Sequence, residues 1–328
     1  MKQDVLIGLQ HGDEGKGKIS KCLSDINNYD CYVRFNGGPN AGHTIIYNDE
    51  EIVLHQLPCG ILKNKPCLIS TDCVVDINKL RSEIKLLESK GINVKNNLYI
   101  SNMCHIITQE SIIEDCTNNK VGTTNSGIGQ TYSKRALRTG KRIHSEPKIY
   151  TLVEPFMFLK KFNNVFFEGA QGFELDINYG DYPYVTSSSC IAQAIFRNGG
   201  DMFKNTEVFG VCKLYDTYVG SKEFGDETDK DLEKLGELGE EIGATTGRKR
   251  KCNWLNVKKL MIACNINRVS TIYMNKCDII KKLGIYKLYG IGDRLFTFAG
   301  YDDMIEYIKT TFNRHNYNIV FSSSKENI

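Results

Sequence analysis

The chain has 328 residues, of which 41% are hydrophobic and 25% charged, and its formal net charge at pH 7 is +3. This composition supports a large buried core in one large or two modest domains. The small net charge disfavours a general nucleic-acid-binding or membrane-surface protein, and no signal-like segment or apolar run of the ~20 residues needed to span a membrane is found.

In chain order, the first predicted elements are a strand at residues 4–9, a helix at 17–26 and a strand at 31–35. Two extended runs on either side of residues 48–50 predict a hairpin. Apolar residues at helical spacing predict a helix over 77–90 that ends before Gly91.

The second half of the chain continues the alternation of strands and helices. Strands are predicted at 164–170, 207–215, 270–278 and 285–291, and helices at 231–242, 257–265 and 304–312. This order predicts an α/β protein whose mainly parallel sheet has helices on both faces. Ligands then bind at the carboxyl ends of the strands, where the glycine-rich stretches fall.

The twelve cysteines include no pair with the CxxC spacing of a metal site or a redox motif. They predict reduced, mostly buried thiols in a cytoplasmic protein.

The stretch GLQHGDEGKGKIS follows the first strand and fits the phosphate-loop spacing GxxxxGK from Gly12 to Lys18. The next residue is Ile19, whereas a Walker loop carries Ser or Thr there to reach magnesium. Asp13 and Glu14 are also unusual, because carboxylates inside a phosphate cradle repel the ligand. The acids therefore have another role, or the match is accidental.

The glycines of this stretch still favour anion binding. Gly12, Gly15 and Gly17 allow backbone amides to crowd toward an anion at a helix N-terminus, and Lys16 and Lys18 can neutralise its charge. The alternative is an ordinary glycine-rich turn with solvated charges.

A second glycine-rich stretch, RFNGGPNAGHTI, follows the second predicted strand. His43 ends this loop, where it can donate a proton or stabilise a phosphoryl oxygen. The alternative is a histidine with a purely structural role.

Two further stretches carry polar chemistry. NKCD, with Asp278 as its last residue, has the form NKxD, in which the carboxylate accepts two hydrogen bonds from guanine and so selects GTP over ATP. GATTGRKRK, at 243–251, offers hydroxyls and cations for a small carboxylate or phosphate ligand. The alternative for NKCD is a strand end with chance charges. The alternative for GATTGRKRK is a basic run that is solvated or binds RNA.

Together these stretches resemble the adenylosuccinate synthetase family over nearly the whole chain. The matching segments, in the family's order, are QHGDEGKGKI, GGPNAGHT, VGTTNSGIGQTYSKRALR, FEGAQGFELDINYGDYPYVTSS, ATTGRKR and NKCD. The resemblance implies one domain over residues 1–328 with the family's P-loop-NTPase-like fold. The chain is shorter than typical bacterial and eukaryotic members and is similar in size to compact archaeal and viral forms.

The resemblance also implies a GTP-dependent ligation of L-aspartate to IMP. Asp13 takes the ring proton beside the six-carbonyl of IMP, and the oxyanion attacks the γ-phosphate of GTP, with His43 and Lys16 stabilising the transferred charge. The amine of aspartate then displaces phosphate from the 6-phosphoryl intermediate. Asp13 also coordinates Mg²⁺, and its carboxylate thereby takes the place of the missing Walker hydroxyl. The ion in turn favours the ionised form of the carboxylate.

Every candidate site residue is assigned by this resemblance. The GTP-binding set is Gly12, Glu14, Gly15, Lys16, Gly17, Gly42, His43, Thr44, Lys276, Asp278 and Ser322. The IMP-binding set is Asp13, Asn40, Thr124, Arg138, Gln171, Thr186 and Arg248. The aspartate-binding set is Thr245, Thr246, Arg248 and Arg250, and the magnesium ligands are Asp13 and the carbonyl of Gly42. A homodimer is implied, in which Arg138 or, alternatively, Arg135 crosses to the partner's IMP phosphate.

Several positions depart from the family pattern. His11 stands where Trp is usual and Pro39 where His is frequent, while Ser126 and Tyr218 stand where the family carries Arg. The last two changes remove positive charge near the nucleotide or aspartate subsite.

Two other functions stay open. A phage relative joins aspartate to dGMP, but it commonly carries a smaller residue such as Ser at the position of Asp13. A non-enzymatic GTP-binding switch needs a true Walker hydroxyl, which Ile19 does not supply. The retained Asp13 favours IMP as the acceptor.

Overall fold

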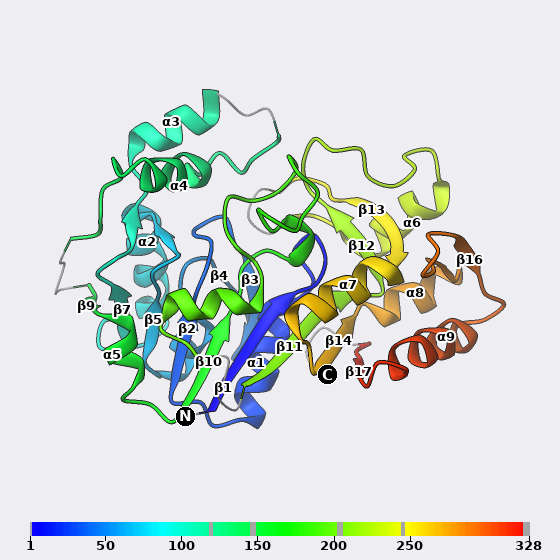
Figure 1. The fold of residues 1–328 in the computed structure, drawn as a ribbon, viewed down its shortest axis with the longest axis horizontal. Coiled ribbons are helices and arrows are strands. Elements are labelled where there is room, and N and C mark those ends of the chain that lie inside the picture. The colour runs from blue at the N-terminus through cyan, green and yellow to red at the C-terminus, as the bar shows by residue number, and fades with distance from the viewer. Residues whose placement is uncertain (1, 118–120, 145–148, 202–205, 244–246, 324–328) are drawn as a thin grey trace.

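The computed structural model describes residues 2–117, 121–144, 149–201, 206–243 and 247–323 (Figure 1). Within these residues, one parallel sheet contains nine strands. In spatial order they are β17 (Asn318–Phe321), β14 (Thr271–Asn275), β11 (Thr206–Lys213), β1 (Lys2–Gly8), β10 (Asn164–Glu168), β2 (Cys31–Arg34), β5 (Cys67–Ile69), β7 (Leu98–Ser101) and β9 (Thr151–Val153). The predicted α/β class with a mainly parallel sheet is confirmed.

The central strands are buried on both faces. Along β1, Val5 and Ile7 join one hydrophobic cluster while Leu6 joins another, and β2 divides Val33 and Tyr32 in the same way. Successive side chains of a strand point to opposite faces, so a strand covered on both sides needs a nearly continuous apolar run. This explains why the segment DVLI forms a strand although polar and apolar residues do not alternate along it.

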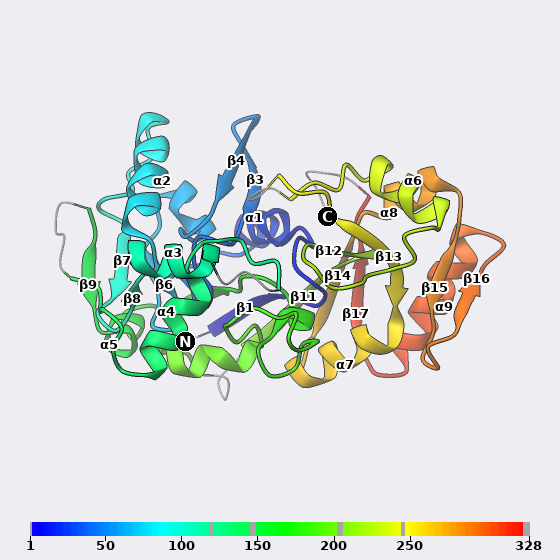
Figure 2. The same cartoon turned by 90° about the horizontal axis from the view of Figure 1, so that it is seen from above.

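Helices cover both faces of the sheet. Figure 2 shows α1 (Lys16–Ile26) and α2 (Ile77–Ser89) on one side, and α5 (Pro155–Leu159) and α7 (Val257–Asn267) on the other. Asp76 caps α2 by accepting hydrogen bonds from the Asn78 and Lys79 amides. None of the described helices combines the length and the hydropathy that crossing a bilayer requires.

The remaining elements surround this framework. The other helices are α3 (Gln109–Thr117), α4 (Ile128–Ala136), α6 (Lys230–Leu238), α8 (Cys277–Leu283) and α9 (Tyr301–Asn313), with 3-10 turns η1 (Cys59–Lys63), η2 (Phe173–Leu175) and η3 (Ala192–Asn198). A smaller sheet contains β12 (Tyr215–Tyr218), β13 (Lys251–Asn256), β15 (Lys287–Tyr289) and β16 (Leu295–Thr297). A two-stranded parallel sheet joins β6 (Val74–Val75) and β8 (His105–Ile106).

The predicted hairpin is β3 (His43–Tyr47) with β4 (Glu50–Leu54). Its turn residues Asn48 and Asp49 have φ angles of 50° and 61°. Two successive left-handed residues match the right-handed twist of the flanking strands.

Three predicted boundaries were wrong because a left-handed residue or a sheet change intervenes. The strand predicted over 270–278 ends at Asn275, since Lys276 has a φ of 63° and α8 follows. The helix predicted over 231–242 ends at Leu238, and Glu240 has a φ of 51°. The strand predicted over 207–215 divides, because Tyr215 already pairs in the second sheet.

Five neighbouring strands in the middle of the sheet (β14, β11, β1, β10 and β2) end at the same edge. The loops that follow β1, β2 and β10 contain the glycine-rich segments identified in the sequence. Parallel pairing therefore brings these segments together, although they are far apart in the chain.

Candidate nucleotide and aspartate site

The loop after β1 turns sharply through left-handed conformations. Gly12, Asp13 and Gly15 have φ angles of 84°, 57° and 91°. A Cβ at Gly17 would come within 2.5 Å of the Thr44 carbonyl oxygen, so glycine allows α1 to lie against β3. This backbone path places Asp13 in the cavity described below.

The two acidic residues of the loop have different surroundings. Glu14 is buried, and its Oε1 accepts hydrogen bonds from the amides of Gln10 and Gly12 at 3.1 and 3.0 Å. Lys16 Nζ lies 2.5 Å from the other oxygen of Glu14. Glu14 therefore stabilises the loop from inside and its charge is neutralised by Lys16, whereas the Asp13 side chain is 34% exposed.

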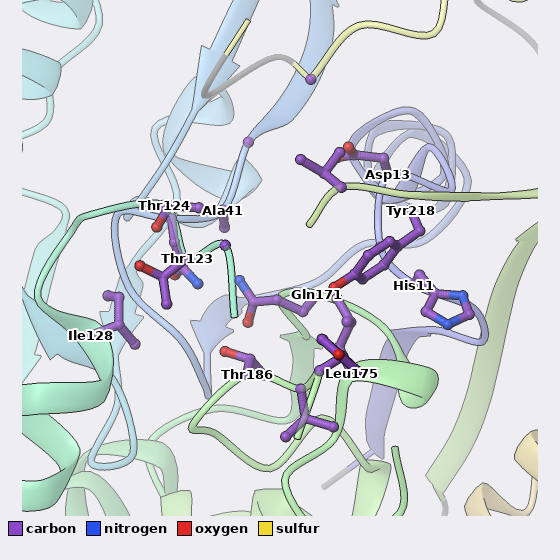
Figure 3. Close-up of a pocket in the computed structure, with 18 of the residues that line it drawn as sticks. His11, Asp13, Ala41, Thr123, Thr124, Ile128, Gln171, Leu175, Thr186 and Tyr218 are labelled. Carbon is purple, nitrogen blue, oxygen red and sulfur yellow. The ribbon is translucent and has the colours of Figure 1, made fainter. Parts of the chain in front are cut away.

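One cavity of about 550 Å³ lies at the carboxyl edge of the sheet. In Figure 3, Asp13, Tyr218, Gln171, Thr124 and Thr186 surround this space. Its lining contains these members of the predicted set: Gly12, Asp13, Gly15, Lys16, Gly17, Asn40, Gly42, His43, Thr44, Thr124, Gln171, Thr186, Arg248 and Arg250. Residues from both predicted nucleotide sets and the predicted aspartate set therefore share one cavity.

The other predicted residues are placed differently. Thr245 and Thr246 lie outside the described residues. Glu14, Arg138, Lys276, Asp278 and Ser322 are not part of the described cavity lining.

Arg135, in the last turn of α4, and Arg138, just after the helix, differ in their surroundings. Arg135 pairs with Asp72 at 3.0 Å and donates to the Thr71 carbonyl, so its guanidinium is held within this chain. Arg138 is exposed beyond the end of α4, with a φ of 63°.

The predicted aspartate segment contacts the predicted base directly. Arg250 Nε lies 2.7 Å from Asp13 Oδ2, and Arg248 Nη1 donates to the Gly122 carbonyl at 3.1 Å. These contacts bring a cationic segment against the carboxylate that follows β1.

His43 is buried beside a cation and an anion. Arg34 Nη1 lies 3.1 Å from both ring nitrogens, and Glu168 Oε2 lies 3.6 Å from Nδ1. Burial and the Arg34 charge lower the pKa of His43 to about 3, despite the opposing effect of Glu168. The imidazole is therefore neutral at physiological pH and can donate only one N–H.

The loop before α4 is held by a carboxylate of α3. Asp115 accepts hydrogen bonds from the Thr123 hydroxyl at 3.0 Å and from the Gly127 amide at 2.9 Å. Ser126, which replaces an expected arginine, accepts a hydrogen bond of 3.4 Å from Lys79. A cation of α2 therefore lies next to this position.

A second lysine lies next to the other replaced arginine. Lys222 Nζ is 5.5 Å from the centre of the Tyr218 ring, pairs with Asp181 at 2.6 Å and lies 3.4 Å from His11 Nε2. His11 Nδ1 is 3.0 Å from Asp216, and its ring packs edge-on against Tyr218. Both substitutions thus retain a nearby positive charge.

The NKCD segment is joined to the phosphate loop through its first residue. Asn275 Nδ2 donates to the Glu14 carbonyl at 2.7 Å, and Asn275 Oδ1 accepts from Lys18 at 3.1 Å. Lys18 also donates to the Ser322 hydroxyl. Asp278 lies in the first turn of α8, and its side chain is 34% exposed.

Sequence reasoning missed the buried partners of the site. Arg34 and Glu168 lie inside the quoted segments but were given no role, whereas Asp115 and Glu241 lie in none of these segments. Contacts such as those between His43 and Glu168, or between Glu241 and Lys213, also join residues that are far apart in sequence. Asn275 could have been identified from the sequence, because it is the first residue of the NKxD pattern.

The parallel sheet, the glycine-rich loop after β1 and the polar cavity at the strand ends define a nucleotide-binding α/β protein. The family model for adenylosuccinate synthetase matches residues 5–164 and 150–291. The chain belongs to this family, and the expectation drawn from its motifs is confirmed.

Relatives share much of the chain. Adenylosuccinate synthetase of Parabacteroides distasonis is 37% identical over 366 residues, covering 93% of this chain and 86% of the relative. The enzyme of Thermodesulfovibrio yellowstonii is 37% identical over 342 residues, covering 88% and 80% respectively.

Two solved structures share the fold. Fully ligated adenylosuccinate synthetase from Plasmodium falciparum has a TM-score of 0.86 at 28% identity, covering 98% of this chain and 97% of that one. A cyanophage S-2L succinoaminodeoxyadenylate synthetase bound to dGMP and dATP has a TM-score of 0.73 at 20% identity, covering 95% and 99%. At that identity, the second comparison supports the fold alone.

Proposed function

We propose that the protein catalyses the GTP-dependent ligation of L-aspartate to IMP, which yields adenylosuccinate, GDP and phosphate. The observation that carries this proposal is the position of Asp13, which lines a cavity shared by the phosphate loop and Arg248 and contacts Arg250 directly. One carboxylate can thus face an acceptor, a phosphate donor and an amine donor at the same time.

Asp13 acts as the general base and takes the ring proton of IMP. Gln171 supports the base from across the cavity. Its Oε1 is buried and has no hydrogen-bond partner among the described residues, so it can accept an N–H from a bound nucleotide. Asn40, Thr124, Thr186 and Arg248 line the same cavity and offer further polar contacts to IMP.

In the first step the six-oxygen of IMP attacks the γ-phosphorus of GTP, and GDP leaves. Neutral His43 donates its N–H to the transferring phosphoryl group, and Lys16, the loop glycines and Thr44 bind the remaining phosphate oxygens. Lys276, Asp278 and Ser322 complete the guanine subsite, where the Asp278 carboxylate accepts from the ring N–H and the amine.

The residues present fit a magnesium ion. The described residues contain no group of three or more His, Cys, Asp or Glu side chains able to hold a metal. Mg²⁺ commonly uses one or two carboxylates together with substrate phosphates, a donor set that Asp13 and the Gly42 carbonyl can complete. Bound there, the ion would neutralise charge on the phosphates.

In the second step the amine of aspartate attacks C6 and phosphate leaves. Arg248 and Arg250 bind the carboxylates of aspartate, together with Thr245 and Thr246. Because Arg250 already lies against Asp13, this places the amine donor beside the base. We further propose a cytoplasmic homodimer in which Arg138 reaches the partner's IMP phosphate, since Arg135 is held by Asp72.

The test is the reaction itself. The purified protein, incubated with IMP, GTP, aspartate and Mg²⁺, should form adenylosuccinate, GDP and phosphate in equal amounts, as measured by chromatography and mass spectrometry. Leaving out any one substrate should abolish product. GTP hydrolysis that is indifferent to IMP and aspartate would refute the proposal.

A further inference from the structure

A buried carboxylate lies behind the cavity wall. The side chain of Glu241, which follows α6, is 0% exposed. Its Oε1 accepts a hydrogen bond of 2.5 Å from the Tyr215 hydroxyl, and its Oε2 accepts one of 2.6 Å from Arg250 Nη1. Lys213 Nζ lies 3.3 Å from both oxygens. Lys213 and Tyr215, at the junction of β11 and β12, and Arg250, just before β13, thus converge on this group.

Positively charged side chains surround the Glu241 carboxylate. Lys213 and Arg250 contact the carboxylate, and Lys276 lies 4.0 Å away. Burial opposes ionisation, but the Lys213 and Arg250 charges outweigh it and hold the pKa of Glu241 at about 2. The carboxylate is therefore charged whenever the protein is folded at physiological pH.

Arg250 is held at two points. Its Nη1 binds buried Glu241, and its Nε binds Asp13 at 2.7 Å in the cavity. The backbone reinforces the first contact, because the Arg250 amide donates to the Glu241 carbonyl at 2.9 Å. A flexible side chain with five N–H donors is thus fixed in one orientation, with one edge inward and one edge toward the base.

We infer that Glu241 is a positioning residue for the proposed ligation: it holds the Arg250 guanidinium against Asp13 and so places the carboxylate of bound aspartate beside the general base. This inference rests on the proposed function. Without Glu241, Arg250 keeps its charge but loses its fixed orientation. The variant should therefore lose mainly affinity for aspartate, because the aspartate carboxylate needs a guanidinium in a fixed orientation.

The experiment compares Glu241→Gln with Tyr215→Phe, which removes a neutral donor from the same carboxylate but leaves its contact with Arg250. Glu241→Gln should raise the KM for aspartate about 10-fold or more, as expected for a lost charged hydrogen bond, with the KM values for IMP and GTP within about 3-fold. Tyr215→Phe should leave the aspartate KM within about 3-fold of wild type. In an Arg250→Ala background, Glu241→Gln should add little to the aspartate KM, because the two act as a unit.

A purely structural role predicts lower thermal stability without this selectivity for aspartate. Should Glu241→Gln fail to fold, Glu241→Asp keeps the buried charge but shortens the side chain, which draws the carboxylate back from Arg250, and the same rise in the aspartate KM should follow. An aspartate KM within about 3-fold of wild type in the folded variant, with the wild type active, overturns only this inference. A wild-type protein that forms no adenylosuccinate overturns the proposed function, and this inference with it.

Discussion

The substitution Asp13→Asn should abolish catalysis and leave the fold intact. Asn is the same size and tolerates the left-handed backbone, with a φ of 57°, that this position adopts. The amide cannot take the ring proton of IMP, and it is a poorer ligand for Mg²⁺. Loss of a general base costs about 100- to 10,000-fold in rate, which corresponds to roughly 2.7–5.5 kcal/mol of transition-state stabilisation.

The same change should have little effect on stability. It removes the ion pair with Arg250, in which the Asp13 side chain is 34% exposed, so screening limits the loss to about 1 kcal/mol at most. That corresponds to a shift in Tm of only a few degrees. Arg250 also keeps its contact with Glu241, so no buried charge is left alone.

The assay follows adenylosuccinate formation and thermal unfolding of the same samples. Asp293→Asn is a matched control, because Asp293 also has a left-handed backbone, with a φ of 56°, and a partly exposed ion pair, with Lys258. The control should keep full activity. If Asp13→Asn retained more than about a tenth of wild-type turnover, well above the range for a lost base, Asp13 would not be the base.

Three further predictions concern stability at low pH, the phosphate donor and the acceptor. The folded-state pKa of His43, about 3, lies below its unfolded value, so the unfolded chain binds the proton first as the pH falls. The free energy of unfolding should therefore decrease by about 1.4 kcal/mol per pH unit between pH 6.5 and 3. Denaturant titrations over this pH range should show a shallower decrease for His43→Asn than for wild type, and an equal pH dependence of the two would contradict the argument. Asp278→Asn should weaken GTP use by about 10-fold or more and favour XTP, measured as kcat/KM, whereas equal use of ATP and GTP by the wild type would mean that NKCD does not read the base. IMP or dIMP should be preferred over dGMP by at least about 10-fold in kcat/KM, because in the proposed complex Asp13 would crowd the two-amino group. Efficient conversion of dGMP in a competition assay would assign the acceptor to the phage type.

The pattern of the amino-acid sequence predicted the fold class, and the segments that resemble the family predicted much of the cavity lining. A strand covered on both faces must be apolar throughout, so DVLI identified the central strand without tertiary information. Left-handed turns and close backbone approaches favour glycine, so the loops around Gly12 and Gly37 were visible as patterns. Parallel strands share one edge for their carboxyl ends, and this rule predicted that the glycine-rich loops carrying Asp13 and His43 lie at the same edge of the sheet.

Only the tertiary structure decided which charges meet. Asp13 and Arg250 are 237 positions apart, and periodicity does not report contacts at that distance. The different surroundings of the two acids in the first loop were not visible in the sequence, because it is the backbone that turns Glu14 inward to the Gln10 and Gly12 amides and leaves Asp13 in the cavity. Glu241 carries no local pattern at all. Its role depends on burial, since a carboxylate removed from water must be paired, and only the packed chain brings Lys213 and Arg250 to it.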